Sequence, residues 1–192
     1  MSYQNILQDG TGRGYLAKVD QTNRLRTQSL TRDEYESQSL KGEAFNINTQ
    51  LMSVATTAET ALLITTNNET RDIILQAWFV ATDTVGAVGS TLGLLRAYFG
   101  ATGFSGGTSV PVVNRRSGAS RSWQLEALKL PTWTPSGDPV LYQTHGIPQR
   151  IFGNVVLALP PGQSVAITTE FAGATVPYSV YAGWTGYLKE EE

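Results

Sequence analysis

The pattern of hydrophobic and polar positions changes near Ala44. Residues 1–43 show no apolar periodicity. From Phe45 onward, short segments alternate apolar and polar side chains with the two-residue period of a half-buried β-strand. The pattern therefore predicts two parts: an extended N-terminal arm over residues 1–43 and a β domain over residues 44–192.

The β domain contains several predicted strands and few convincing helices. This combination favours an all-β fold, an antiparallel β-sandwich of jelly-roll type. Residues 123–130 fit a strand or a short helix equally well. The predicted strands are 45–49, 61–66, 72–82, 92–99, 155–159, 164–171 and 180–188.

Alternation along the predicted strand 72–82 divides its side chains between two faces. One face carries Ile73, Leu75 and Phe79, and the other carries Trp78. We expect the first face to lie in the core and Trp78 to face a helix, the arm or a neighbouring subunit. The predicted core is Ile73, Leu75, Phe79, Leu157 and Ile167.

The arm is polar and rich in both signs of charge. It holds six of the 14 basic residues of the chain and six of the 16 acidic ones. Such a segment buries too little apolar surface to offset its ordering entropy, so it is predicted to be disordered in isolation. Thr31 and Glu34 have the spacing of a capping box and Gly42 is a suitable stop, which predicts one helix over residues 32–40. Turn formers at 20–23 predict a small hairpin between residues 17–19 and 24–26.

Composition limits the classes of function. The chain has 192 residues, a net charge of −2 and only 16% charged residues, where about 25% is usual, so much of its surface is neutral and suited to permanent contacts. The basic residues are scattered, and nucleic-acid binding is not expected. The first residues lack the features of a secretory signal, and no window is apolar enough to span a bilayer, which predicts synthesis in a cytoplasm and no membrane partner.

No catalytic, metal or cofactor site is predicted. The chain has no cysteine and a single histidine, His145, which fits a loop or turn better than a catalytic role. The acidic residues show no spacing that selects a catalytic pair. Six aromatic residues could form a sugar-stacking platform, although core and interface packing is the commoner use of such side chains: Trp133, Trp184, Tyr142, Tyr178, Tyr181 and Tyr187.

Residues 100–122 form a long glycine-rich segment that is predicted to be a surface loop. It carries Arg115, Arg116 and Arg121, which could meet an acidic neighbour, nucleic-acid phosphate or water. Loops of this length commonly bind something or are ordered by a neighbour. We therefore expect assembly contacts at these arginines, within a homo-oligomer whose acidic C-terminal residues 189–192 could be their partners. In the arm we expect such contacts at Arg13, Arg24 and Arg26.

One stretch resembles a known group of proteins. The run GTGRGYLAKVDQTNRLRTQSLTRDEYESQSLKGEAFNINT, residues 10–49, resembles the leading segment of tailed-bacteriophage virion structural proteins, in which a short polar arm precedes a β-sandwich. The segments ALLITTNNETRDIILQAWFV and VVLALPPGQSVAITTEF look like sandwich strands of the same group. The resemblance covers the arm well and the remainder in style.

The resemblance implies a non-enzymatic virion protein made in the cytoplasm of a bacterial host. The expected function is that of a capsid decoration or cement protein that binds the outside of the head. Its partners would be phage structural proteins, either the major capsid protein or tail components, and a trimer is the oligomer expected for a cement protein. The alternative is a carbohydrate-binding jelly-roll module of a fibre or baseplate, and a weaker third function is a glycan hydrolase with two suitably spaced carboxylates.

Overall fold

A computed structural model describes residues 7–8, 16–17, 34–54, 58–83, 93–145, 150–171 and 178–189. The chain divides into two units, residues 1–33 and 34–192. In the first unit, β1 (Leu7–Gln8) pairs antiparallel with β2 (Leu16–Ala17). The hairpin predicted across residues 17–26 is therefore not the pairing found for Ala17, and its second strand lies outside the described residues.

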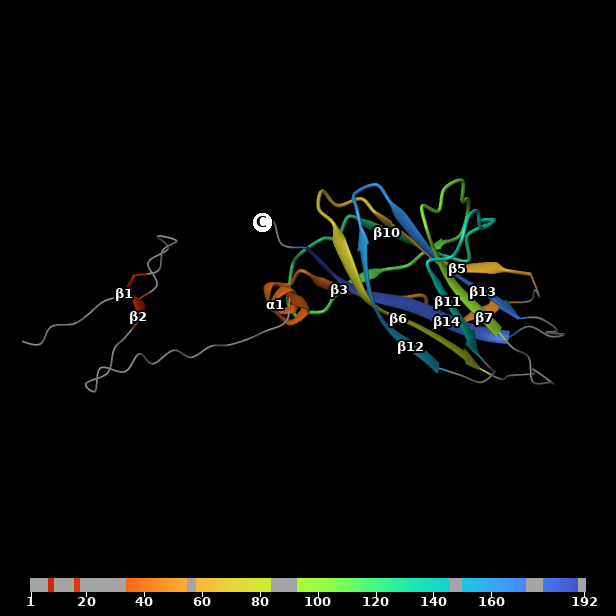
Figure 1. Ribbon diagram of the computed structural model, residues 1–192, viewed down its shortest axis with the longest axis horizontal. Helices are drawn as coiled ribbons and strands as arrows, with labels where there is room; N and C mark the ends of the chain where they lie inside the picture. Colours follow the sequence, from red (N-terminus) through yellow and green to blue (C-terminus); the bar gives the residue numbers. More distant parts are fainter. Residues whose placement is uncertain are drawn as a thin grey trace, which may run out of the picture. The chain divides into compact units, whose positions relative to one another are not determined.

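The second unit is an antiparallel sandwich of two β-sheets, as the strand pattern predicts (Figure 1). What we call the helix-bearing sheet has the strand order β12 (Arg150–Leu159), β6 (Ile73–Asp83), β14 (Tyr178–Leu188), β3 (Ala44–Asn48), β9 (Val112–Asn114), with β4 (Met52–Val54) also paired to β14. The facing sheet has the order β11 (Leu141–His145), β7 (Gly93–Phe99), β13 (Ser164–Phe171), β5 (Thr60–Asn67), β10 (Leu125–Lys129), β8 (Thr108–Ser109).

The single helix among the described residues, α1 (Glu34–Lys41), packs on β3 and β14. The predicted residues 32 and 33 lie outside the described residues, and the helix ends at Lys41, directly before the predicted glycine stop. Helix α1 belongs to the second unit, which starts at Glu34.

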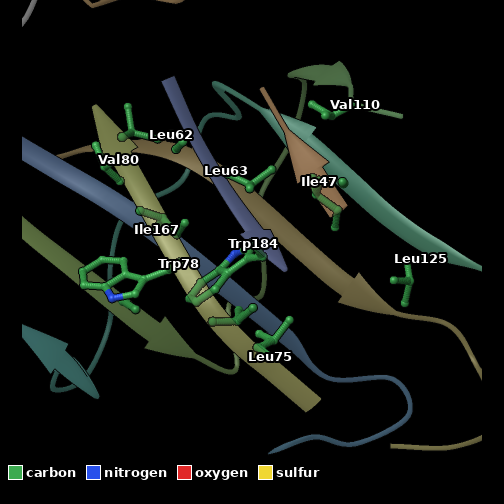
Figure 2. Close-up of a cluster of buried hydrophobic side chains, with 14 of the residues drawn as sticks. Ile47, Leu62, Leu63, Leu75, Trp78, Val80, Val110, Leu125, Ile167 and Trp184 are labelled. Carbon is green, nitrogen blue, oxygen red and sulfur yellow. The ribbon is translucent and has the colours of Figure 1, made fainter. Parts of the chain in front are cut away.

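The core lies between the two sheets and is built from the inward side of each alternating strand. Figure 2 shows side chains from both sheets meeting there, with Trp78 and Trp184 side by side. A smaller apolar cluster on the outer side of the facing sheet joins Ile64 and Ala166 to Phe104 and Trp133. Fully buried members of the main core include Phe45, Ile47, Leu62, Leu63, Ile73, Leu75, Leu95, Leu159, Val165, Ile167 and Trp184.

The predicted core is right for Ile73, Leu75 and Ile167, which are fully buried. Leu157 is only partly buried and packs against the core. The prediction is wrong for Trp78 and Phe79. Trp78 lies in the core with 4% of its surface exposed, whereas Phe79 is half-buried on the outer face and packs near Tyr181.

A β-bulge at Gln76 explains why Trp78 and Phe79 lie on the faces opposite to those predicted. Thr185 of β14 pairs with Ala77, but the next residue, Gly186, pairs with Leu75, so Gln76 is left without a partner in β14. The extra residue reverses the side-chain alternation, because side chains in a strand change face at every position. Trp78 therefore continues the inward face that Leu75 begins.

Three segments between the predicted strands also differ from a plain loop. Residues 125–129, within the segment that fits a strand or a helix equally well by sequence, form strand β10, which pairs with β5. The long segment 100–122 contains β8 and β9. Strand β11 and the first half of β12 flank proline-rich sequence and were not predicted.

Replacing Trp78 by alanine should therefore lower the free energy of unfolding much more than replacing Phe79. Loss of the buried indole should cost about 3 to 5 kcal/mol through lost burial and the cavity that remains. Phe79→Ala should cost less, because the ring is partly exposed on the outer face and leaves no closed cavity. Urea unfolding of the two variants measures the difference. Equal losses would place both side chains in the same environment and contradict the bulge.

Candidate functional site

Charged side chains gather in two places on the sandwich. The first, which we call the helix clamp, surrounds α1 and contains Tyr35, Glu43, Glu69, Arg71, Arg115, Arg116 and Arg121. The second, which we call the outer-face cluster, lies on the facing sheet and contains Glu59, Arg96, Tyr142, Thr168 and Glu170.

An aromatic contact seats α1 on the sheet. Tyr35 packs against Ala44, Ile74 and Tyr187, and its ring meets that of Tyr187 edge-on at 5.8 Å between centroids. The Tyr187 hydroxyl also donates a hydrogen bond to the Glu34 carboxylate at 3.2 Å. An edge-on ring pair stabilises packing beyond the apolar area that it buries.

The C-terminal end of α1 is closed by a Schellman motif and by donors from the arginine-bearing loop. The Gly42 amide donates to Ser39 and the Glu43 amide to Gln38, with Gly42 at a φ of 79°. From the loop, Asn114 Nδ2 donates to the Gly42 carbonyl at 2.6 Å and Arg116 Nη1 donates to the Leu40 carbonyl. A cation at this end is also favoured by the helix dipole.

Ion pairs fasten the residue that follows the helix to the body of the sandwich. Glu43 lies 3.1 Å from Arg71 and 3.6 Å from Arg121, measured between nitrogen and carboxylate oxygen. Arg121 also binds Glu69 at 2.9 Å, and its guanidinium lies 4.9 Å from the centre of the Trp123 ring. Arg121 therefore connects the loop, the end of α1 and the turn after β5.

The position of Glu69 is set by the sequence of that turn. Asn67 is fully buried, and its Oδ1 accepts a hydrogen bond from the Glu69 amide at 2.9 Å. Its Nδ2 donates to the carbonyls of Arg71 and Leu159, which ties the turn to the opposite sheet. Asparagine is suited to such turns because its short side chain can replace backbone partners.

The structure brings the three predicted loop arginines together around α1. Arg115 is exposed and its guanidinium lies 5.4 Å from the centre of the Tyr35 ring, Arg116 is exposed and bonds the helix end, and Arg121 is partly buried in ion pairs. These contacts are all within one chain, so a contact with a second chain stays a prediction. Arg13, Arg24 and Arg26 lie outside the described residues.

The outer-face cluster places one arginine between two carboxylates. Arg96 Nη1 on β7 lies 2.7 Å from Glu59 and 2.9 Å from Glu170. Thr168, fully buried on the neighbouring strand, donates its hydroxyl to Glu59. Because Thr168 and Arg96 are directly paired across β13 and β7, the strand register itself positions the cluster.

Tyr98 lies beside this cluster, two residues from Arg96 on the same face of β7. Burial, followed by a hydrogen bond to Glu59, raises the pKa of the Tyr98 hydroxyl from 10 to about 12. Its ring meets that of Trp133 edge-on at 5.6 Å between centroids, and Trp133 Nε1 donates to the Thr102 carbonyl.

The six aromatic residues considered for a sugar platform are dispersed. Trp184 and Tyr178 are core residues, Tyr187 lies under α1, and Tyr181 and Trp133 are half-buried. Tyr142 differs, with 58% of its surface exposed. Most of these residues therefore serve packing, which the sequence analysis favoured over a sugar-stacking platform.

Sequence reasoning missed the outer-face cluster. Glu59 and Glu170 are distant in the chain, and no spacing connects them to Arg96. The available signal was a lone arginine inside an apolar strand, since such a charge on a covered face requires a carboxylate partner. His145 ends β11. In the described part of the chain, no group of three or more His, Asp or Glu side chains could hold a metal ion.

No protein-family model matches the chain, and no curated protein matches it. Among the described residues, no helix has the length and apolar character needed to cross a membrane.

Arg121→Ala should destabilise the sandwich more than Arg115→Ala. Glu69 is 7% exposed, so removing Arg121 leaves a nearly buried carboxylate without its cation, at a cost of about 1 to 3 kcal/mol. Arg115 offers only an exposed cation–π contact, which should contribute less than about 1 kcal/mol. Urea unfolding at neutral pH measures both variants. The ranking is wrong if the two curves coincide.

Stability should fall as the pH rises from 10 to 12, in part because of Tyr98. Its pKa is higher in the folded protein than in the unfolded chain, so its contribution is complete below pH 10 and is lost as the pH reaches about 12. A displacement of this size corresponds to roughly 2 to 3 kcal/mol. The unfolding free energy of the wild type, measured across this range, should fall relative to that of Tyr98→Phe by about this amount. Parallel curves would assign the alkaline loss to other groups.

Proposed function

We propose that the chain is a non-enzymatic structural protein of a tailed-phage virion, a capsid decoration or cement protein that binds the outer surface of the head and stabilises it. The observation that carries the proposal is the helix clamp. It fixes the root of a polar arm to a small sandwich through an aromatic contact, a capped helix end and an ion-pair group. An arm that holds neighbouring subunits needs a firmly attached last segment, here α1 and Glu43. Without such an attachment, contacts made by the arm would not hold the sandwich in place.

The strand order supports a jelly-roll assignment. Strands β3, β14, β6 and β12 are neighbours in one sheet, and β5, β13, β7 and β11 are neighbours in the other. The chain changes sheet at each step from β5 to β6 and β7, and again from β11 through β12 and β13 to β14. Eight strands in two such sheets suit a double Greek key, with β8, β9 and β10 as an insertion that widens both sheets.

An extended arm can hold neighbouring subunits of a capsid shell together with few residues. It gives a large contact area from few residues, although part of the interaction energy is lost in ordering it. The low charge of the chain fits long-lived contacts with phage structural proteins and with copies of itself, and a trimer remains the proposed oligomer. The exposed Arg115 and Arg116 can meet carboxylates of a neighbour, but both also contact α1.

Two truncations should separate the arm from its root. Removing residues 1–33 should leave a folded sandwich with near-normal stability that no longer binds phage particles. Removing residues 1–43 should also destabilise the fold, because it uncovers Ile74 and Tyr187, at about 1.5 to 3 kcal/mol for a fully re-exposed side chain. Circular dichroism, urea unfolding and sedimentation with intact particles measure these effects.

Several outcomes would contradict this proposal. Normal particle binding by the shorter truncation would show that the arm makes no assembly contacts. Loss of β-structure in that truncation would show that residues 1–33 belong to the folding unit. Electron microscopy of labelled particles adds a direct test, since a lattice position on the head supports a cement role and a position on a tail appendage supports the fibre or baseplate alternative.

A further inference from the structure

Tyr142 is the exposed member of the outer-face cluster. It lies on β11, the last strand at one edge of the facing sheet, and pairs directly with Arg96 of β7. The Arg96 guanidinium lies 5.7 Å from the centre of the Tyr142 ring, while 58% of the residue remains exposed. One face of the ring is therefore supported by the protein, and the ring is still available to a ligand.

The groups beside the ring are held in place before any ligand arrives. Arg96 is fixed by Glu59 and Glu170, and Glu59 is fixed in turn by Thr168. The side chain of Glu170 is 31% exposed, so its carboxylate can accept hydrogen bonds from outside the protein. Because folding already fixes the ring and the acceptor, little further conformational entropy is lost when a ligand binds.

We propose that Tyr142 and Glu170, held by Arg96, form a binding site for a neutral sugar ring. The C–H face of a pyranose can stack on the exposed ring, and its hydroxyl groups can donate to the carboxylate. Two carboxylates and one arginine leave the cluster negative, which disfavours anions. The ring already has a cation against it, which makes a second cation a poorer fit than a neutral ring.

The geometry fits binding better than hydrolysis. A glycosidase uses one carboxyl group to donate a proton to the leaving oxygen. Here both carboxylates accept from the same Arg96 nitrogen, so neither is presented to a sugar as a proton donor. The expected activity is recognition of a glycan without cleavage.

This site is independent of the cement role. It lies on the facing sheet, whereas α1 packs on the helix-bearing sheet, so variants at Tyr142 should bind particles normally. Failure of the sugar site would leave the assembly proposal standing, and failure of the particle assay would leave this one standing.

The test uses the full chain and saturation-transfer NMR with methyl glycosides of glucose, galactose, mannose and N-acetylglucosamine. At least one should bind at millimolar concentration, and Tyr142→Ala should weaken it about tenfold or more, because the stacking face is lost. Tyr142→Phe should retain binding, because the stacking face is kept. Glu170→Gln should weaken binding less than Tyr142→Ala, since an amide oxygen still accepts.

Matched controls distinguish this site from general stickiness or charge. Val156→Ala changes another exposed edge residue, on the opposite sheet, and should leave binding unchanged. Methyl glucuronide should bind more weakly than methyl glucoside because of the negative cluster, and spermidine should not compete. The proposal is overturned if none of the four neutral glycosides binds, if Tyr142→Ala binds as the wild type does, or if spermidine alone shows binding that depends on Tyr142. A folded spectrum of each variant is required for these comparisons.

Discussion

The stacked indoles of Trp78 and Trp184, 6.2 Å apart between centroids, are the contact around which the sandwich is arranged. The two residues are directly paired across β6 and β14, and both point between the sheets. Because β14 also pairs with β3 and β4, this cross-strand pair fixes the register of most of the helix-bearing sheet. The neighbouring strand makes room for it, since any Cβ at Gly153 would collide with the Trp78 ring.

Filling the space between the sheets with apolar rings and aliphatic side chains moves the charges to the outer faces. There they form compact groups with partly buried partners, Glu43, Glu69, Arg71 and Arg121 on one side and Glu59, Arg96 and Glu170 on the other. Ion pairs that are open to water contribute little individually. Their value here is positional, because each group fixes side chains that a neighbouring molecule can reach.

Local sequence signals predicted which segments form strands and the helix better than they predicted which side chains face the core. The alternation at 45–49 and 164–171, the Gly42 stop and the all-β class all depend on nearest neighbours in sequence, and the structure confirms them. The faces of Trp78 and Phe79 depend on a bulge at Gln76, which arises from how β6 meets β14 and has no local marker. The Glu59–Arg96–Glu170 group is likewise a product of strand register, which a single sequence does not specify.

The same dependence decides how α1 is attached to the sheet. A helix of eight residues is marginal in water by itself, so α1 forms because Tyr35 and the loop donors hold it against the sheet. The sandwich therefore positions α1, and no residue of α1 belongs to the main core. Since α1 has few buried apolar contacts, it should open at a lower free energy than the sheets. A partner that binds residues N-terminal to α1 and tightens this attachment would stabilise the sandwich through the helix clamp, as the proposed cement role requires.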